Sequence, residues 1–280
     1  LQAINPALIY CSLSGFGQTG PISTKAGHDL AYIAMGGGLA QRGQLRQAPS
    51  RSSLPVADIA GGSFAAVAIL AAMHDRKEGE TGAVLDLSLY ESVLYSSAIR
   101  FGFETSVDEN NHLYPANDLF TCGDGRQIAL TIVETKFWDS FVEVTREIQP
   151  AFGQNAFATE EGRLENSDKL MALLDELFAS QPAAHWIAFL DPADVPATIC
   201  VSNQETITSD HAKARAMHMK SGETTVMPFP VIASGQHVTS NQRTAPARSI
   251  DATKIMGKLG YSASEISDLA AQSIIEVPDK

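Results

Sequence analysis

Residues 12–21 read Ser12-Leu13-Ser14-Gly15-Phe16-Gly17-Gln18-Thr19-Gly20-Pro21, and this stretch decides the fold. The apolar run that leads into it, from Leu8 to Ser14, predicts a buried strand that ends at Gly15. Residues 15–20 also match GxGxxG, the pattern of a dinucleotide-binding turn. Pro21 interrupts the helix that such a turn requires, and no acid stands about twenty residues past the strand to hold a ribose. We therefore interpret the stretch as a glycine-rich turn, without a nicotinamide or flavin site.

The residues that follow alternate between helix and strand patterns. Small and apolar residues from Gly27 to Ala40 predict a helix. Residues 56–74 are dense in Ala, Ile and Leu and predict a buried helix, with Asp58 near its start. Residues 83–88 predict a strand, and we expect a helix through Glu91 to follow it. This order predicts an α/β protein.

The middle of the chain begins with a polar, irregular stretch from Asp108 to Asn117, which predicts a domain boundary. Gly123-Asp124-Gly125 then predicts a hairpin turn that leads into a strand at 127–133. We expect a helix from Lys136 onward. Residues 166–190 have the apolar periodicity of two amphipathic helices.

The last part of the chain, beyond about residue 215, predicts short strands separated by Pro- and Gly-containing loops. A closing helix is expected at 261–275, because Ser262 and Glu265 have the spacing of a capping box. We divide the chain into part of a large domain at 1–115, a small α/β domain at 116–215, and a return to the large domain at 216–280.

Composition excludes some classes of function. The chain has 280 residues and a formal net charge of -12, with 44% hydrophobic and 19% charged residues, which is typical of soluble globular proteins. A nucleic-acid surface needs clustered Lys and Arg, so we expect no nucleic-acid partner. The sequence has no uninterrupted run of 18 apolar residues, so we expect no spanning helix and no membrane partner.

The cysteines indicate a compartment. Cys11, Cys122 and Cys200 lie far apart, with neither a CxxC pair nor the spacing of metal ligands, so we expect no metal site. An odd, sparse count is typical of a reducing compartment. We therefore expect a cytoplasmic protein, or a mitochondrial or peroxisomal one if the source is eukaryotic. The sequence begins with Leu1 rather than Met, which we interpret as a trimmed or partial chain.

Over a longer span, the glycine-rich stretch closely resembles the class III CoA-transferase (CaiB/BaiF) and α-methylacyl-CoA racemase superfamily. The resemblance continues into Ala26-Gly27-His28-Asp29, where Gly-His-Asp resembles the racemase branch. Further blocks resemble the family in the expected order: Val56-Ala57-Asp58-Ile59-Ala60-Gly61-Gly62, Asp86-Leu87-Ser88-Leu89-Tyr90-Glu91 and Ala193-Asp194-Val195-Pro196-Ala197.

The resemblance implies a Rossmann-like large domain, a smaller α/β domain, and an interlocked homodimer with active sites between domains. Family members carry roughly a hundred further N-terminal residues, and we expect the matching first strands and much of the coenzyme-A pocket to be missing here. The implied substrate is an acyl-CoA thioester. Coenzyme A would be part of the substrate, and no covalently bound cofactor is implied.

The resemblance also assigns roles to residues. His28 and Asp58 would be the two acid/base groups, and Glu134 would orient His28, although Glu134 is equally well explained as the start of a helix. The implied substrate- and CoA-binding residues are Gly27, Asp29 and Tyr32.

Inversion of the carbon beside a thioester carbonyl requires a proton to leave one face and another to arrive on the opposite face. An imidazole is accessible in both protonation states near neutral pH, which suits His28. Asp58 would need apolar surroundings that let it carry a proton part of the time. Backbone N–H groups around Gly27 to Asp29 would stabilise the enolate oxygen.

One residue departs from the racemase pattern, and other functions stay open. Racemases of this family carry an Asn four residues before the acid, where this chain has Leu54. Asp58 would therefore be tuned differently or be supported by Ser52 or Ser53. Glu91 matches the position of the acid that attacks acyl-CoA in the transferase branch, so a CoA-transferase is the second hypothesis. A non-catalytic family member that keeps only dimerisation is the third.

Overall fold

The structure is a computed structural model that describes residues 1–39, 53–76, 81–101, 114–217, 219–221, 224–237, 246 and 248–277. The chain divides into two compact units, Leu1–Cys200 and Val201–Lys280. Within the first unit there are two separate hydrophobic cores, one formed by residues between 16 and 93 and the other by residues between 116 and 195. Our division of the chain at 115 and 215 stays a prediction.

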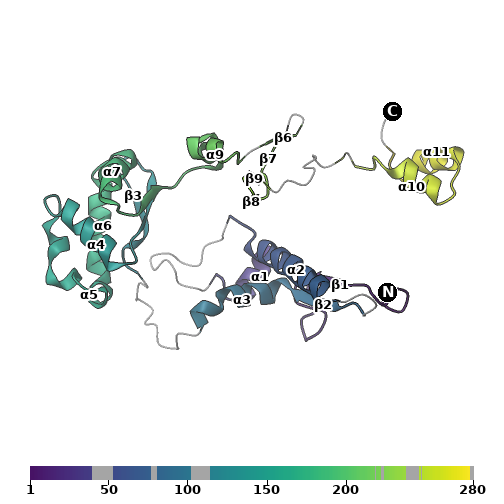
Figure 1. The fold of residues 1–280 in the computed structure, drawn as a ribbon, viewed down its shortest axis with the longest axis horizontal. Coiled ribbons are helices and arrows are strands. Elements are labelled where there is room, and N and C mark those ends of the chain that lie inside the picture. The colour runs from purple at the N-terminus through teal and green to yellow at the C-terminus, as the bar shows by residue number, and fades with distance from the viewer. Residues whose placement is uncertain are drawn as a thin grey trace. The chain divides into compact units, whose positions relative to one another are not determined.

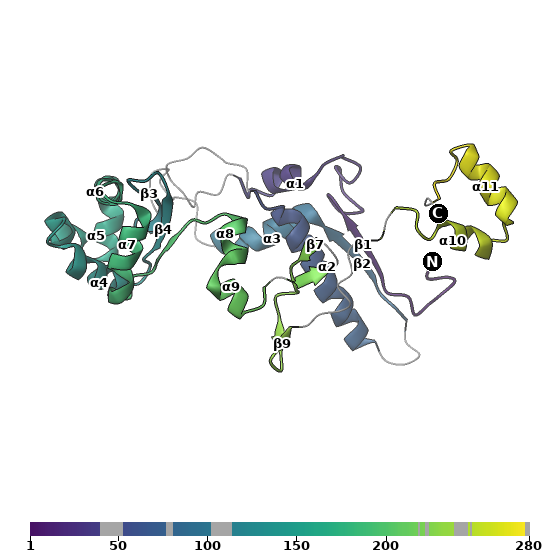
Figure 2. The same ribbon diagram turned by 90° about the horizontal axis from the view of Figure 1, so that it is seen from above.

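A parallel strand pair with helices packed beside it forms the first core (Figures 1 and 2). The two strands pair from Tyr10 opposite Val84 to Ser14 opposite Ser88. A parallel pair needs a crossover connection, which two helices provide here, and the longer of them packs against both strands. The elements are β1 (Tyr10–Ser14), α1 (Asp29–Met35), α2 (Val56–Asp75), β2 (Val84–Ser88) and α3 (Leu89–Phe101).

These elements confirm the strands expected before Gly15 and at 83–88, and the helices expected at 56–74 and through Glu91. The strand before Gly15 is not buried as expected: among the described residues it pairs with β2 alone, and Tyr10 and Leu13 are 43% and 45% exposed. Helix α1 is shorter than expected, because the backbone turns at Gly36 and Gly37 adopts a φ of 80°, which ends the helix. Most of the boundary expected at 108–117 lies outside the described residues, and Asn117 begins the next strand.

The burial of α2 differs from the prediction. We expected a buried helix, but its buried residues are the small Ala57, Gly61 and Ala65. The first core supplies few side chains to cover the rest of a 20-residue helix, so most of its large apolar residues stay exposed. The exposed large apolar side chains of α2 are Val56, Ile59, Val67, Leu70 and Met73.

Helix α2 is also long and apolar enough to cross a membrane, by length and composition alone. Our expectation of no spanning helix and no membrane partner stays a prediction. The expectation rested on uninterrupted apolar runs, whereas polar residues such as Asp58 and His74 lie near the ends of α2. Core helices of soluble proteins meet the same criterion, so it is weak evidence for a membrane.

Residues 114–200 fold around the second core, which combines aromatic and aliphatic side chains. The expected hairpin turn joins two antiparallel strands, with Phe120 opposite Ile128, and a third strand pairs with the second. The elements are β3 (Asn117–Thr121), β4 (Gln127–Thr131), α4 (Thr135–Thr145), the 3-10 helices η1 (Pro150–Gly153) and η2 (Asn155–Phe157), α5 (Glu160–Glu165), α6 (Ser167–Ala179), α7 (Ala183–Leu190), η3 (Asp191–Ala193) and β5 (Ala197–Ile199).

A buried arginine fits this core because its charge has partners. The Nη1 of Arg163 donates to the carbonyl of Phe157 at 3.1 Å, and the guanidinium lies 5.1 Å from the centroid of the Trp138 ring. Burial lowers the pKa of Arg163, and the nearby carboxylates of Glu160 and Asp139 oppose that shift. The arrangement satisfies a cation inside an otherwise apolar cluster.

The second unit is built from short elements. The expected short strands form two antiparallel pairs, and the expected closing helix carries the predicted capping box. Backbone and side-chain hydrogen bonds from Ser262 lower the pKa of Glu265. The elements are α8 (Asn203–Thr208), α9 (Asp210–Ala214), β6 (Met219–Ser221), β7 (Thr224–Val226), β8 (Ile232–Ala233), β9 (Gln236–His237), α10 (Ala252–Lys258) and α11 (Ala263–Ala271).

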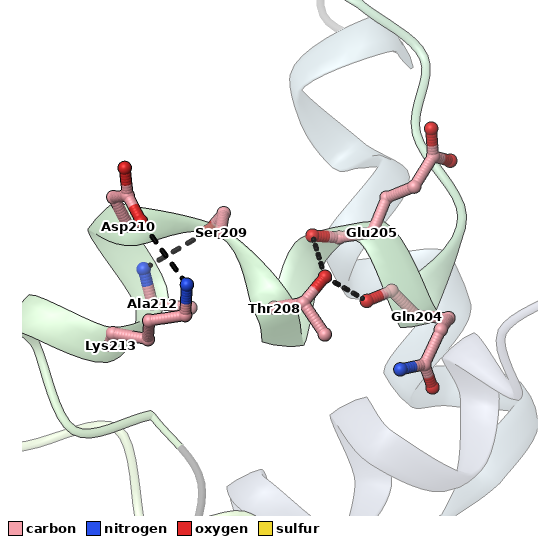
Figure 3. A network of polar contacts seen from close by, with 7 residues as sticks. All are labelled: Gln204, Glu205, Thr208, Ser209, Asp210, Ala212 and Lys213. Atoms are coloured by element: carbon pink, nitrogen blue, oxygen red, sulfur yellow. Dashed lines mark hydrogen bonds and ion pairs between the residues drawn. The ribbon is translucent and has the colours of Figure 1, made fainter.

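Local hydrogen bonds hold the first two helices of this unit, as Figure 3 shows. The Thr208 hydroxyl donates to the carbonyl of Gln204 at 2.9 Å and ends α8. The Ser209 hydroxyl then accepts from the Ala212 N–H at 3.1 Å and begins α9. These contacts explain why two short helices follow each other directly.

Candidate functional site

His28 lies at the start of α1, as the residue that precedes its first turn. Its backbone is extended, with φ -132° and ψ 173°, and its carbonyl accepts from the Ala31 N–H at 2.8 Å. The side chain forms no capping bond and is exposed. The imidazole is therefore free of structural bonds in the part of the chain that the structure describes.

Asp29 connects this helix to α2. Its Oδ1 accepts from the Ala57 N–H at 2.8 Å and from the Asp58 N–H at 3.3 Å. Asp58 is exposed in the first turn of α2. The structure therefore brings the backbones that carry His28 and Asp58 close together, although the two residues are 30 positions apart in the sequence.

Tyr32 fixes the glycine-rich stretch against α1. Its hydroxyl donates to the carbonyl of Gly27 at 2.5 Å, and its ring packs edge-on against Phe16 with the ring centroids 5.2 Å apart. A Cβ atom on Gly15 would lie 2.6 Å from this ring, so only glycine fits there. Tyr32 is 7% exposed, and its polar atom is already used. Roles of Gly27, Asp29 and Tyr32 in binding CoA stay predictions.

Two residues of β2 were not singled out by the sequence reasoning. Both oxygens of the Asp86 carboxylate accept from the Gln18 N–H, at 3.1 and 3.0 Å, and so hold the glycine-rich turn. The Ser88 hydroxyl donates to the Gly15 carbonyl at 3.3 Å and accepts from the Glu91 N–H at 3.2 Å. Ser88 is the helix cap before α3, and its position before an acidic first turn was the available signal.

Glu91 lies in the first turn of α3 with an exposed side chain. Through Ser88 its backbone is connected to the turn that precedes His28. His28 precedes α1, Asp58 lies in α2 and Glu91 lies in α3, and these three helices pack against one another.

Glu134 does not belong to these three helices. It precedes the first turn of α4, and its side chain is exposed and forms no capping bond. None of the hydrogen bonds and ion pairs among the described residues joins it to His28. Its role in orienting His28 stays a prediction. Leu54, at the position of the racemase Asn, is 62% exposed just before α2. Ser52 lies outside the described residues.

Metal ligation finds no support in the described ranges, where no group of three or more His, Cys, Asp or Glu side chains is arranged to hold an ion. The chemistry available at this group of helices is that of an exposed imidazole and exposed carboxylates. Such groups can transfer protons or attack an acyl carbon.

Known proteins resemble the chain along most of its length. A family model described as CoA-transferase family III matches residues 1–250. The human protein "Alpha-methylacyl-CoA racemase" is 27% identical over 290 residues, which cover 99% of this chain and 73% of the human protein. The "Acetyl-CoA:oxalate CoA-transferase" of Acetobacter aceti is 30% identical over 243 residues, which cover 84% of this chain and 62% of that enzyme.

Solved structures agree on the fold. A CAIB/BAIF family protein from Brucella suis has a TM-score of 0.74 at 24% identity, over 92% of this chain and 69% of that one. Its mixed helices and strands support the expected family fold. The match of the family model to residues 1–250 shows that the chain belongs to CoA-transferase family III.

Proposed function

We propose that the protein acts on acyl-CoA thioesters and interconverts the (R) and (S) forms of 2-methylacyl-CoA. The racemases among its relatives support this reaction, and the transferases among them support the same substrate class. Coenzyme A enters as part of the substrate, and the chemistry needs no covalently bound cofactor. Because the chain spans 62% to 73% of the first three relatives, the activity is proposed for the whole protein.

The reaction exchanges protons through two groups. The neutral imidazole of His28 removes the proton from one face of the α-carbon, and the electron pair moves to the thioester oxygen as an enolate. The protonated carboxyl of Asp58 then returns a proton to the other face, so one proton is taken and one is given. In the reverse direction the roles exchange. Each such group typically contributes about 10²–10⁴-fold to the rate.

The observation that carries the proposal is the pair of hydrogen bonds from the start of α2 to Asp29. The N–H groups of Ala57 and Asp58 lie 2.8 and 3.3 Å from the Oδ1 of Asp29. Because Asp29 directly follows His28, these bonds hold the segment with Asp58 beside the segment with His28. Both candidate side chains are exposed in the described structure, so both are accessible to a substrate. Two groups on opposite faces of one carbon require this kind of approach between distant segments.

The test follows the α-proton of a single-enantiomer 2-methylacyl-CoA in D₂O by NMR, with the full-length protein. We expect loss of the proton signal with retention of the thioester, because the returned proton comes from solvent. His28→Ala and Asp58→Asn should each slow the exchange at least ~100-fold.

Matched controls lie at the far end of the same helix. His74 and Asp75 are exposed in the last turn of α2, more than ~20 Å along its axis from Asp58. His74→Ala and Asp75→Asn should change the exchange rate less than about twofold, since isolated surface changes are usually neutral. Exchange that is equally fast in His28→Ala would refute the two-base reaction.

A CoA-transferase is the second candidate, favoured by the position of Glu91 in the first turn of α3. Its carboxylate would attack the thioester carbonyl and release CoA thiolate, which would then attack the resulting anhydride and release the acyl group as a carboxylate. Hydroxylamine would convert the CoA-bearing Glu91 to a hydroxamate and free CoA. Peptide mass spectrometry locates the label, and a label on Asp58 would contradict a nucleophilic Glu91.

We also propose a homodimer. The exposed apolar side chains of α2 support it, because large apolar patches on a folded chain usually mark an interaction surface. The interlocked arrangement and the three-segment domain division belong to the same proposal.

A non-catalytic role would be favoured if the full-length protein showed no CoA binding by calorimetry.

A further inference from the structure

The start of α2 has no cap of its own. Pro55 precedes the helix and provides no side-chain hydrogen bond. The Val56 N–H donates to the Leu54 carbonyl at 2.9 Å, whereas the next two N–H groups, of Ala57 and Asp58, depend on Asp29. Unsatisfied first-turn N–H groups normally require a side-chain oxygen, which proline lacks. The helix start therefore relies on a carboxylate from 28 residues earlier in the chain.

Asp29 also directly follows His28 in the chain. One carboxylate thus holds the backbone of Asp58 while its own backbone continues from His28. We propose that Asp29 is a positioning residue of the racemase reaction, which sets the spacing between His28 and Asp58 by capping α2. This inference rests on the proposed function and gives Asp29 a different task from the binding of CoA.

The contacts favour positioning over CoA binding. Asp29 is partly buried, and its Oδ1 already accepts two N–H groups. A carboxylate also repels the phosphate groups of coenzyme A, since like charges at short distance are unfavourable. The carboxylate is therefore committed to α2.

The chain provides a matched control in Asp124. Both of its carboxylate oxygens accept from the Ala183 N–H at 3.3 Å, at the first residue of α7. It is a carboxylate that caps a helix distant in sequence, as Asp29 is, but α7 carries no candidate catalytic residue. A purely structural role predicts the same consequences for the loss of either carboxylate.

The experiment measures kcat and KM for α-proton exchange, and the Tm, in Asp29→Ala, Asp29→Asn and Asp124→Ala. We expect kcat of Asp29→Ala to fall about 10–100-fold, with KM changed less than about threefold, because small misplacements of reacting groups are costly. Asp29→Asn keeps an acceptor oxygen and should restore kcat to within about fivefold. Asp29→Ala and Asp124→Ala should both lower the Tm by ~2–4 °C, but Asp124→Ala should leave kcat unchanged.

Amide hydrogen exchange provides a readout that does not need activity. The Ala57 and Asp58 amides should exchange faster in Asp29→Ala and stay protected in Asp29→Asn. If Asp29→Ala does not fold, Asp29→Ser takes its place as a shorter acceptor, with an intermediate kcat expected.

The outcomes separate the two proposals. A wild-type protein without α-proton exchange would remove the proposed function, while the amide protection would still report the cap. An active wild type with unchanged kcat in Asp29→Ala would overturn the positioning role. Equal losses of kcat in Asp29→Asn and Asp29→Ala, or in Asp124→Ala, would also overturn it.

Discussion

The two cores of the first unit differ in how far each covers its own apolar surface. Residues 114–200 bury large aromatic and aliphatic side chains completely, including Trp138, Phe141 and Trp186. Residues 1–101 bury a small cluster around Phe16 and Tyr32, while Leu70 of α2 stays 63% exposed. A strand pair needs further strands or partners to be stable in water. Three of the candidate residues, His28, Asp58 and Glu91, therefore lie in the part of the first unit with the most apolar surface left to cover, whereas Glu134 lies in the well-covered part.

The largest expected effect concerns the covered core. Trp138→Ala removes a 1% exposed side chain that packs against Phe141 and Phe152, so unfolding of residues 114–200 should become easier by about 3–5 kcal/mol. Chemical denaturation followed by fluorescence of the remaining Trp186 measures it. Leu70→Ala on α2 is the control and should cost less than about 0.5 kcal/mol in a monomer. Equal losses in the two variants would break the comparison.

A smaller effect is expected from the buried cation of the same core. Arg163→Leu keeps an apolar stem but leaves the Phe157 carbonyl without its 3.1 Å donor and removes the contact with Trp138. The loss of a buried hydrogen-bond partner typically costs about 1–3 kcal/mol in free energy of unfolding. The same denaturation measurement applies, with Arg146→Leu on the exposed C-terminal end of α4 as the control. A higher free energy of unfolding for Arg163→Leu would show that the buried charge destabilises this core.

The exposed apolar side chains of α2 should affect self-association more than folding. Val67→Ser together with Leu70→Ser replaces two side chains that are 64% and 63% exposed. If a second copy covers them, as we propose, self-association should weaken at least ~10-fold, which corresponds to ~1.4 kcal/mol. Analytical ultracentrifugation of the full-length protein measures this.

The control for this face is a polar pair change on the second unit, Thr206→Ser with Lys213→Gln, which should leave association unchanged. An unchanged dimer in the α2 double variant would remove this face from the interface. Recovery of the wild-type protein on neutral lipid vesicles would instead connect α2 to a membrane, against our expectation.

The smallest expected effect is the dependence of stability on pH that arises from the buried thiol of Cys122. Burial, and then the charge of Asp124, raise the pKa of the Cys122 thiol from 9.0 to about 11. The folded state therefore holds this proton more tightly than the unfolded state. Its contribution to stability should be fully present below pH 9.0 and be lost as the pH rises to about 11. Denaturation curves across that window measure it, and Cys122→Ala should show a smaller decline.

Thiol modification near neutral pH gives a second measurement for Cys122. The exposed Cys200 should react with a disulfide reagent first, and the buried Cys122 should react only after unfolding. Rapid modification of Cys122 in the folded protein would show that this core opens readily.

Sequence patterns predicted the local elements well where neighbours in the chain decide the structure. The strand before Gly15, the hairpin at 123–125 and the capping box of Ser262 depend on residues within a few positions of each other. The family resemblance rested on short stretches as well, such as residues 12–21 and 56–62, and the family model confirmed it over residues 1–250. The candidate residues His28 and Asp58 were found in this way, and their catalytic roles remain predictions.

The burial of α2 could not be predicted from its composition. An apolar helix of 20 residues predicts a core position, but burial depends on which other segments pack against it. Within the described residues its fully buried side chains are all small, namely Ala57, Gly61 and Ala65, while Phe64 and Ile69 are only partly buried.

The α/β elements, the turn chemistry and the family could be predicted from the order of the amino acids, because these follow from backbone conformation and short-range side-chain patterns. Three contacts became known only from the packed chain: Asp29 caps α2, Asp86 holds Gln18, and Ser88 connects Gly15 to Glu91. Each of these contacts joins segments that are remote in sequence. A hydrogen bond between remote segments forms only after the chain has packed, so no local pattern specifies it.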